Sequence, residues 1–192
     1  MFNDTSSALS LLATRRSGKP RDMVAPGPSD PELHAMLAIA ARVPDHGKLA
    51  PWRFVIVGAD QRGALADILT AAYRTSKPDV SDPELETVVQ FAHQAPTLVV
   101  VLSSPQVPSK IPLWEQELSA GAACLQLLNA ATAHGYVGGW LTGWASYDER
   151  VRDAFGTAAE KIAGFVFIGS PGRPLEERPR PDLAQVVSRW QV

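Results

Sequence analysis

Basic residues at both ends of the chain have the chemistry of a phosphate clamp. Arg15, Arg16 and Ser17 follow the expected end of a helix and place two guanidinium groups and a hydroxyl within three residues. Arginine forks pair with phosphate oxygens, and a serine hydroxyl donates to one more. Arg178 and Arg180 alternate with prolines, which stiffen their backbone, and are a second candidate for the same phosphate. The alternatives are that the first pair only complements a helix dipole and that the second lies in a solvated tail.

Residues 42–54 carry a second group of chemically useful side chains. Pro44, Gly47 and Pro51 prevent regular structure there. The polar and aromatic members are Arg42, Asp45, His46, Lys48, Trp52 and Arg53. Cations, hydrogen-bond donors and a rigid ring suit a flat, anionic, heteroaromatic ligand. The alternative is a solvated loop with its tryptophan in the core.

Residues 140–144 form a third candidate, because they follow directly on a buried strand. Gly143 allows a ligand close to the backbone, where an N–H could donate to a ring nitrogen. The alternative is a tight turn with two core tryptophans.

Composition limits the class of protein. The 192 residues fit one domain, 1–192, and 45% hydrophobic with 20% charged residues is ordinary for a globular chain. A formal net charge of −2 argues against a general nucleic-acid binder. The N-terminus lacks a signal pattern, and no apolar run approaches the ~20 residues of a membrane helix. We therefore expect a soluble, cytoplasmic protein with no membrane or nucleic-acid partner.

Several kinds of site are not expected. Cys124 is the only cysteine and is expected mid-helix and buried, so neither a disulfide nor a thiol nucleophile is predicted. The four histidines lack metal-ligand spacing, so we predict no metal. The glycine-rich dinucleotide motif, the Walker A motif and Gly-x-Ser-x-Gly are also missing from the sequence.

Hydrophobic periodicity predicts the elements that position these residues. Helices are expected over about 7–14, 30–40, 61–73, 82–93, 115–134 and 147–155, with Asp30 capping the second. Strands are expected over 54–57 (buried on both faces), 97–102, 136–140, 162–168 and, as a terminal strand or wrap, 182–190. Leu118, Ala122, Leu125, Leu128 and Thr132 form one face of the longest helix, whose many small residues indicate a central or subunit-interface position, and Gly135 is expected to end it. The pattern favours an α/β or α+β fold with a central sheet.

In this order the pieces resemble the nitroreductase family, most closely its small YdjA-like NAD(P)H nitroreductases. The resemblance covers nearly the whole chain. The matching pieces are Arg15-Arg16-Ser17, Arg42 to His46, Ala50 to Phe54, Trp114 to Gly121, Gly138-Gly139-Trp140 and Ile162 to Gly169.

The resemblance implies an α+β, three-layer nitroreductase-like fold. It implies a central, mostly antiparallel sheet flanked by helices, and a homodimer with the long helix and non-covalent FMN at the subunit interface. The implied FMN contacts are Arg15, Arg16, Ser17, Arg42, His46, Trp140, Leu141, Thr142, Gly143 and Arg180. A nicotinamide segment is implied at Ala130, Ala131, Thr132, Ala133, His134 and Gly135.

This chain departs from the family at several places. Leu141 stands where related small members carry arginine, and Asp45 to Lys48 replace the Ser/Asn-rich loop of larger members. The long insertions that shape substrate pockets in larger members are missing, so substrate identity does not transfer.

The implied activity is FMN-dependent oxidation of NADH or NADPH with reduction of nitroaromatic or quinone-type acceptors. Hydride passes through flavin N5 in a ping-pong scheme, and Arg16 or Lys19 stabilises the reduced flavin. No catalytic side chain is obligatory, and His46 as a proton donor is a hypothesis. The alternatives are a flavin-destroying or dehalogenating enzyme, an FMN store or sensor with little turnover, and an α/β interaction domain.

Overall fold

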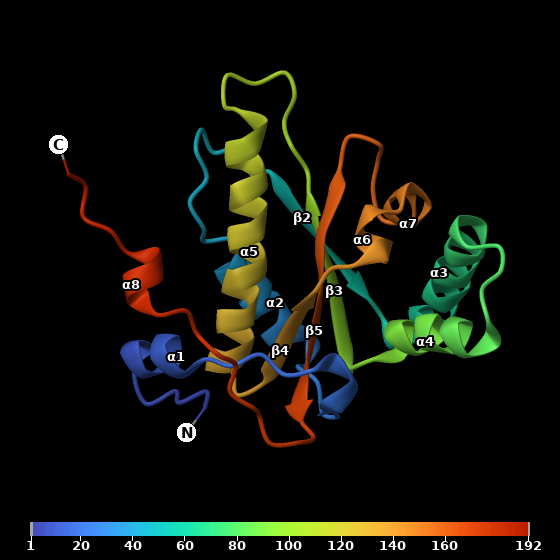
Figure 1. Cartoon of the computed structure of the whole chain (residues 1–192), viewed down its shortest axis with the longest axis horizontal. Helices are drawn as coiled ribbons and strands as arrows, with labels where there is room; N and C mark the ends of the chain where they lie inside the picture. The colour runs from blue at the N-terminus through green and yellow to red at the C-terminus, as the bar shows by residue number, and fades with distance from the viewer. Residues whose placement is uncertain (1, 192) are drawn as a thin grey trace.

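The computed structural model describes residues 2–191, which fold as a sheet between two layers of helices (Figure 1). Over these residues the sheet has five strands. They are β1 (Met23–Val24), β2 (Trp52–Val57), β3 (Thr97–Ser103), β4 (Val137–Leu141) and β5 (Lys161–Pro171). β5 pairs with β3, with β4 and, at its end, with β1, and β3 also pairs with β2. Every pairing is antiparallel, which confirms the expected α+β sheet.

The buried strand β3 separates two hydrophobic clusters. Its side chains alternate, so Leu98, Val100 and Leu102 pack in one cluster while Val99 and Val101 pack in the other. The first cluster includes residues of α3 (Arg62–Ser76), α4 (Asp82–His93), α6 (Trp144–Tyr147) and α7 (Glu149–Asp153). The second includes residues of α2 (Asp30–Ala40) and α5 (Leu113–Ala133). The short helices α1 (Ala8–Thr14) and α8 (Leu183–Val186) lie near the chain ends, outside these clusters (Figure 1).

Capping boxes that begin with serine start two of the α-helices. Ser29, not Asp30, is the N-cap of α2, and its backbone N–H and hydroxyl both donate to the Glu32 carboxylate in a capping box. The prediction for Asp30 was wrong by one residue, because the capping-box acid lies three residues after serine. Ser81 and Glu84 start α4 in the same way. The C-terminal end of α5 lies just before Gly135, whose φ of +86° confirms the expected left-handed cap.

Three other predictions of local structure were wrong. β2 is not buried on both faces, because it pairs only with β3 at the sheet edge and leaves Ile56 39% exposed. The helix expected over 147–155 is shorter than predicted: α7 begins only after Asp148, whose carboxylate accepts from the Arg150 N–H and caps it, and α6 is a separate short helix that ends at Tyr147. Residues 182–190 form no strand; α8 is a single short helix followed by irregular chain.

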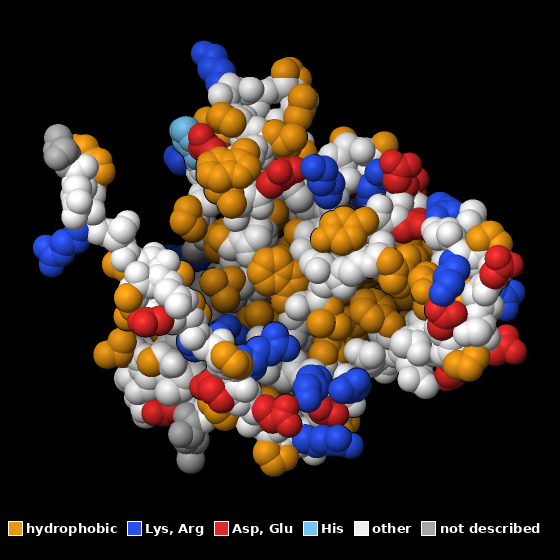
Figure 2. All heavy atoms as spheres, in the orientation of Figure 1, with side chains coloured by type: hydrophobic (Ala, Val, Ile, Leu, Met, Phe, Trp, Pro, Cys, Tyr) orange, Lys and Arg blue, Asp and Glu red, His pale blue; other side chains and the backbone are white. Residues whose placement is uncertain are grey.

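One face of α5 remains uncovered in the single chain. Of the residues predicted to share one face of this helix, Leu128 and Thr132 are buried, whereas Leu118 is 53% and Leu125 46% exposed. The buried side is made by small residues such as Ala123 and by Leu127. Figure 2, which views the molecule from the side on which α5 is seen, shows hydrophobic side chains across the middle of the molecular surface, with Lys and Arg side chains below them. Among residues 2–191, no helix is long and apolar enough to cross a membrane.

Candidate cofactor site

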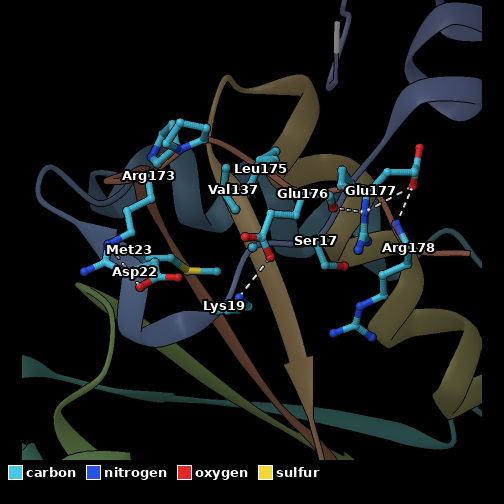
Figure 3. Close-up of a pocket in the computed structure, with 14 residues that line it drawn as sticks. Ser17, Lys19, Asp22, Met23, Val137, Arg173, Leu175, Glu176, Glu177 and Arg178 are labelled. Carbon is cyan, nitrogen blue, oxygen red and sulfur yellow. Dashed lines mark hydrogen bonds and ion pairs between the residues drawn. The ribbon is translucent and has the colours of Figure 1, made fainter.

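The segment after α1 runs beside the start of β4. The backbone N–H of Gly18 donates to the carbonyl oxygen of Gly138 at 3.2 Å. Residues 16–19 line a pocket of about 310 Å³ whose opposite wall is the arm 173–178 (Figure 3). The two ends of the chain therefore meet at one site, as a shared phosphate clamp requires.

Three guanidinium groups gather at this meeting point. Burial, together with the nearby charges of Arg16 and Arg180, lowers the pKa of Arg15. Arg15 also donates from Nη1 to the Ser17 hydroxyl at 3.2 Å. Arginines from both chain ends that raise one another's electrostatic energy are complementary to an anion with several oxygens.

Two glutamates that sequence reasoning missed already contact these cations. Arg16 donates from Nε to the backbone carbonyl of Glu176 at 2.7 Å and lies 3.5 Å from Glu177 Oε1. Lys19 donates from Nζ to the Glu176 carboxylate at 3.0 Å, which lowers the pKa of Glu176 (Figure 3). Arg180 Nη2 lies 3.7 Å from Glu177 Oε1. The available sequence signal was a pair of adjacent acids inside an otherwise basic, proline-containing arm.

The far end of β4 presents a flat surface and an open backbone. Trp140 is 38% exposed and is held by a 3.0 Å hydrogen bond from its indole Nε1 to the Ala163 carbonyl oxygen. Leu141 is half-buried and Thr142 is exposed. Gly143 has a φ of +125°, and a Cβ placed there would meet nothing within 4 Å. An approaching ligand can therefore reach its backbone.

The two parts of the site are linked by the strand itself. The backbone from Gly138, which receives the Gly18 bond, to Gly143 spans about 16 Å at a strand rise of about 3.3 Å per residue. A ligand with an anionic end and a ring end can follow this line.

A second pocket, of about 300 Å³, lies beside Thr142 and was not anticipated from the sequence. Its walls come from α3, α4 and α6 and are largely apolar and aromatic. The rings of Tyr73 and Trp144 have centroids 4.7 Å apart and form one side. Such a lining suits an apolar aromatic ring.

Neither Arg42 nor His46 lines the pocket at the start of β4 within one chain. His46 Nδ1 is 2.7 Å from Glu115 Oε2, in the first turn of α5. The pocket between residues 16–19 and the arm 173–178 instead includes Val137, beyond the last turn of that helix. A 21-residue helix is about 30 Å long, so the His46–Glu115 contact and this pocket lie near opposite ends of α5. Within one chain His46 is therefore separated from the arginine cluster by most of the length of α5.

Other members of the 42–54 segment stabilise the fold. The Asp45 carboxylate accepts hydrogen bonds from the backbone N–H groups of Leu49 and Ala50 at 3.0 and 2.8 Å. Arg53 donates through Nε to Glu160 Oε1 at 3.0 Å and through Nη2 to Oε2 at 3.1 Å. These residues are accordingly explained without a ligand.

The expected nicotinamide segment is mostly internal. The side chains of Ala130, Ala131 and Thr132 are buried, and the Thr132 hydroxyl donates to the Leu128 carbonyl. The segment therefore offers a nicotinamide cofactor only Ala133, His134 and Gly135, which are exposed.

Cys124 and the acidic and histidine side chains form no further site in the described chain. Cys124 is buried in α5, and burial raises the pKa of its thiol to about 12. At neutral pH the thiolate nucleophile is therefore not formed. From residue 2 to residue 191, no group of three or more His, Cys, Asp or Glu side chains could hold a metal ion.

Comparison with known proteins bears on the whole architecture. The model of the nitroreductase family matches residues 12–170. A protein of Haemophilus influenzae named "Putative NAD(P)H nitroreductase" is 35% identical over 175 residues, covering 90% of this chain and 93% of its own. "Putative NAD(P)H nitroreductase YdjA" of Escherichia coli K12 is 32% identical over 165 residues, covering 85% and 88%.

The fold also matches a solved structure. A variant of the FMN- and NADPH-dependent nitroreductase NfnB from Sphigopyxis sp. strain HMH superimposes with a TM-score of 0.74 at 20% identity, covering 96% of this chain and 99% of that one. This likeness establishes the fold.

Proposed function

This chain belongs to the nitroreductase family, and on that premise we propose that it is an FMN-dependent NAD(P)H oxidoreductase that reduces nitroaromatic or quinone-type acceptors. One observation carries the proposal. β4 has the arginine cluster at its start and an exposed ring surface with open backbone at its end. FMN likewise has a charged phosphate at one end and a flat ring at the other. The electron donor is proposed to be NADH or NADPH, because the names of the relatives include NAD(P)H.

The residues at this site fit the phosphate and the ring of FMN. Arg15, Arg16, Ser17 and Arg180 are proposed to hold the phosphate, because they supply charge and donors from both chain ends. Lys19, two residues after Ser17, is proposed to lie at the pyrimidine edge, where a cation stabilises negative charge.

The end of β4 is proposed to line the ring. Trp140, Leu141 and Thr142 would form its floor, and the backbone N–H near Gly143 would face the ring nitrogen. When bound, FMN supplies the hydride-transfer chemistry, while the protein binds and orients it. No side chain is assigned a proton-transfer role.

A second copy of the chain would complete the site. The uncovered apolar face of α5 supports a homodimer, because exposed Leu118 and Leu125 need a covering surface. In such a dimer Arg42 and His46 of the second copy are proposed to reach the flavin. The aromatic pocket beside Thr142 is proposed to receive the ring of the acceptor. We place the protein in the cytoplasm, where NAD(P)H is available.

The deciding experiment is the visible absorption spectrum of the purified protein, with the released chromophore identified. We expect a yellow protein with one FMN per chain that oxidises NADPH or NADH when a quinone is added. Bound FMN without NAD(P)H oxidation would support an FMN store or sensor instead. A protein that stays colourless after incubation with FMN would refute the flavin assignment.

A further inference from the structure

The carboxylate of Glu177 lies where an anionic ligand of the arginine cluster belongs. Its Oε1 atom is 3.5 Å from Arg16 Nε and 3.7 Å from Arg180 Nη2. The same oxygen accepts the backbone N–H of Arg178 at 2.8 Å. One oxygen thus faces two guanidinium groups and one N–H.

This arrangement is chemically that of a bound oxyanion. Arginine forks and backbone N–H groups are the donors that recognise phosphate, and a carboxylate is the side-chain group that imitates it. Glu177 itself is 60% exposed and lies in an arm without regular secondary structure. The Arg180 side chain is also exposed, whereas that of Arg16 is only 8% exposed, but at 3.5 and 3.7 Å neither guanidinium group hydrogen-bonds this carboxylate, so both ion pairs are weak enough to exchange with a ligand.

The neighbouring Glu176 has a different role. Its carboxylate pairs with Lys19, while its backbone carbonyl, not its side chain, accepts from Arg16. Replacing the Glu176 carboxylate by a neutral amide therefore leaves the contacts of Glu177 with Arg16 and Arg180 unchanged. The chain thus offers a matched control one residue away.

We propose that Glu177 is an intramolecular competitor of the FMN phosphate and thereby sets the selectivity between phosphorylated and unphosphorylated flavin. The inference rests on the proposed FMN function. The phosphate must displace the carboxylate from Arg16 and Arg180 before it can bind them. Riboflavin has no phosphate and leaves the carboxylate in place. Wild-type protein accordingly prefers FMN over riboflavin by less than the arginine cluster alone would allow.

The test compares flavin binding by apo-protein prepared from wild type, Glu177→Gln and Glu176→Gln. Quenching of flavin fluorescence gives Kd for FMN and for riboflavin at the same ionic strength. We expect Glu177→Gln to lower the Kd of FMN about three- to fivefold, the range for an exposed ion pair, and to leave that of riboflavin within about twofold. Glu176→Gln should not change the ratio of the two constants. Thermal unfolding of each variant checks that the arm still docks.

Two results would overturn the inference. One is an unchanged FMN affinity in Glu177→Gln; the other is an equal gain for riboflavin, which would indicate a general effect on the arm. A calorimetric titration with inorganic phosphate provides a test that does not depend on flavin. Here too Glu177→Gln should bind the ligand more tightly than wild type. If neither flavin binds wild type, the proposed function fails, and the phosphate titration still decides the role of Glu177.

Discussion

Gly164 on β5 lies directly under the indole of Trp140 on β4. A Cβ at residue 164 would be 2.0 Å from Trp140 Nε1, far inside van der Waals contact. The missing side chain lets the indole cross to β5 and donate to the Ala163 carbonyl oxygen. The orientation of the exposed ring surface at the proposed flavin site is therefore set from the neighbouring strand.

Gly164→Ala should displace Trp140. Overpacking of this kind costs about 1–3 kcal/mol, measurable as a lower midpoint in urea unfolding. FMN affinity should fall in the same variant, because the ring surface is moved. The control is Gly63→Ala in α3, where a Cβ meets nothing within 4 Å and alanine is the better helix former. Equal effects of the two changes would contradict the link between residues 164 and 140.

Arg15→Gln should weaken FMN binding about 10- to 100-fold, since hydrogen bonds to charged groups contribute about 1.5–3 kcal/mol. Riboflavin binding should change much less, because it has no phosphate. Kd values from fluorescence titration separate the two flavins. Arg189→Gln removes the same charge from an exposed position in the C-terminal segment and should leave both Kd values unchanged.

Mixed dimers should reveal whether the site is shared between subunits. Arg15→Gln and His46→Ala lie at opposite ends of α5 in one chain but at one site in the proposed dimer. Each homodimer carries its defect in both sites. Random mixing after unfolding and refolding should restore about one quarter of the sites to the unsubstituted set, by two-fold symmetry. Turnover per chain should rise above that of either parent; no gain on mixing would place both residues in the same subunit's site or outside it.

Leu118→Asp should give a monomer. A charge on the uncovered face of α5 is expected to cost several kcal/mol once that face is buried between subunits. Sedimentation velocity measures the oligomeric state, and the flavin-to-protein absorbance ratio should fall with it. Ile68→Asp, at an exposed apolar position on α3, should stay dimeric. A dimeric Leu118→Asp protein would rule out this face as the interface.

Glu160→Gln should lower stability at neutral pH. The Arg53 fork lowers the pKa of Glu160 from 4.5 to about 2. A depressed folded-state pKa stabilises the protein above the unfolded value, and this stabilisation is lost as pH falls from about 4.5 towards 2. Because Arg53 is half exposed, we expect a loss of about 1–2 kcal/mol at pH 7.

Urea unfolding at a series of pH values checks this. Wild type and Glu160→Gln should converge as the pH approaches 2. Glu86→Gln, at an exposed position on α4, should match wild type at every pH. A constant difference across the series would mean that the pair acts through packing and not through charge.

Helices and strands with strong local patterns were predictable. Thr97 to Leu102 is a continuous β-branched and apolar run, and the strand expected there is confirmed as β3, which lies buried between β2 and β5. Positions that depend on neighbours were not predictable: Ile56 has the same apolar character but lies on an edge strand. Leu118 and Leu125 fit a helix face equally well whether that face meets the sheet or a second chain.

By itself the sequence determined the order of the elements, the residue types of a phosphate clamp and the glycine that ends α5, because capping, periodicity and turn chemistry act over a few residues. Tertiary structure alone decided which of these residues meet. Arg16 and Glu176 are 160 positions apart and are brought together when the arm after β5 returns past the start of β4. The same packing places His46 against Glu115, at the other end of α5. Long-range pairing of strands sets the distances between residues that are far apart in the sequence, and no local sequence pattern predicts these distances.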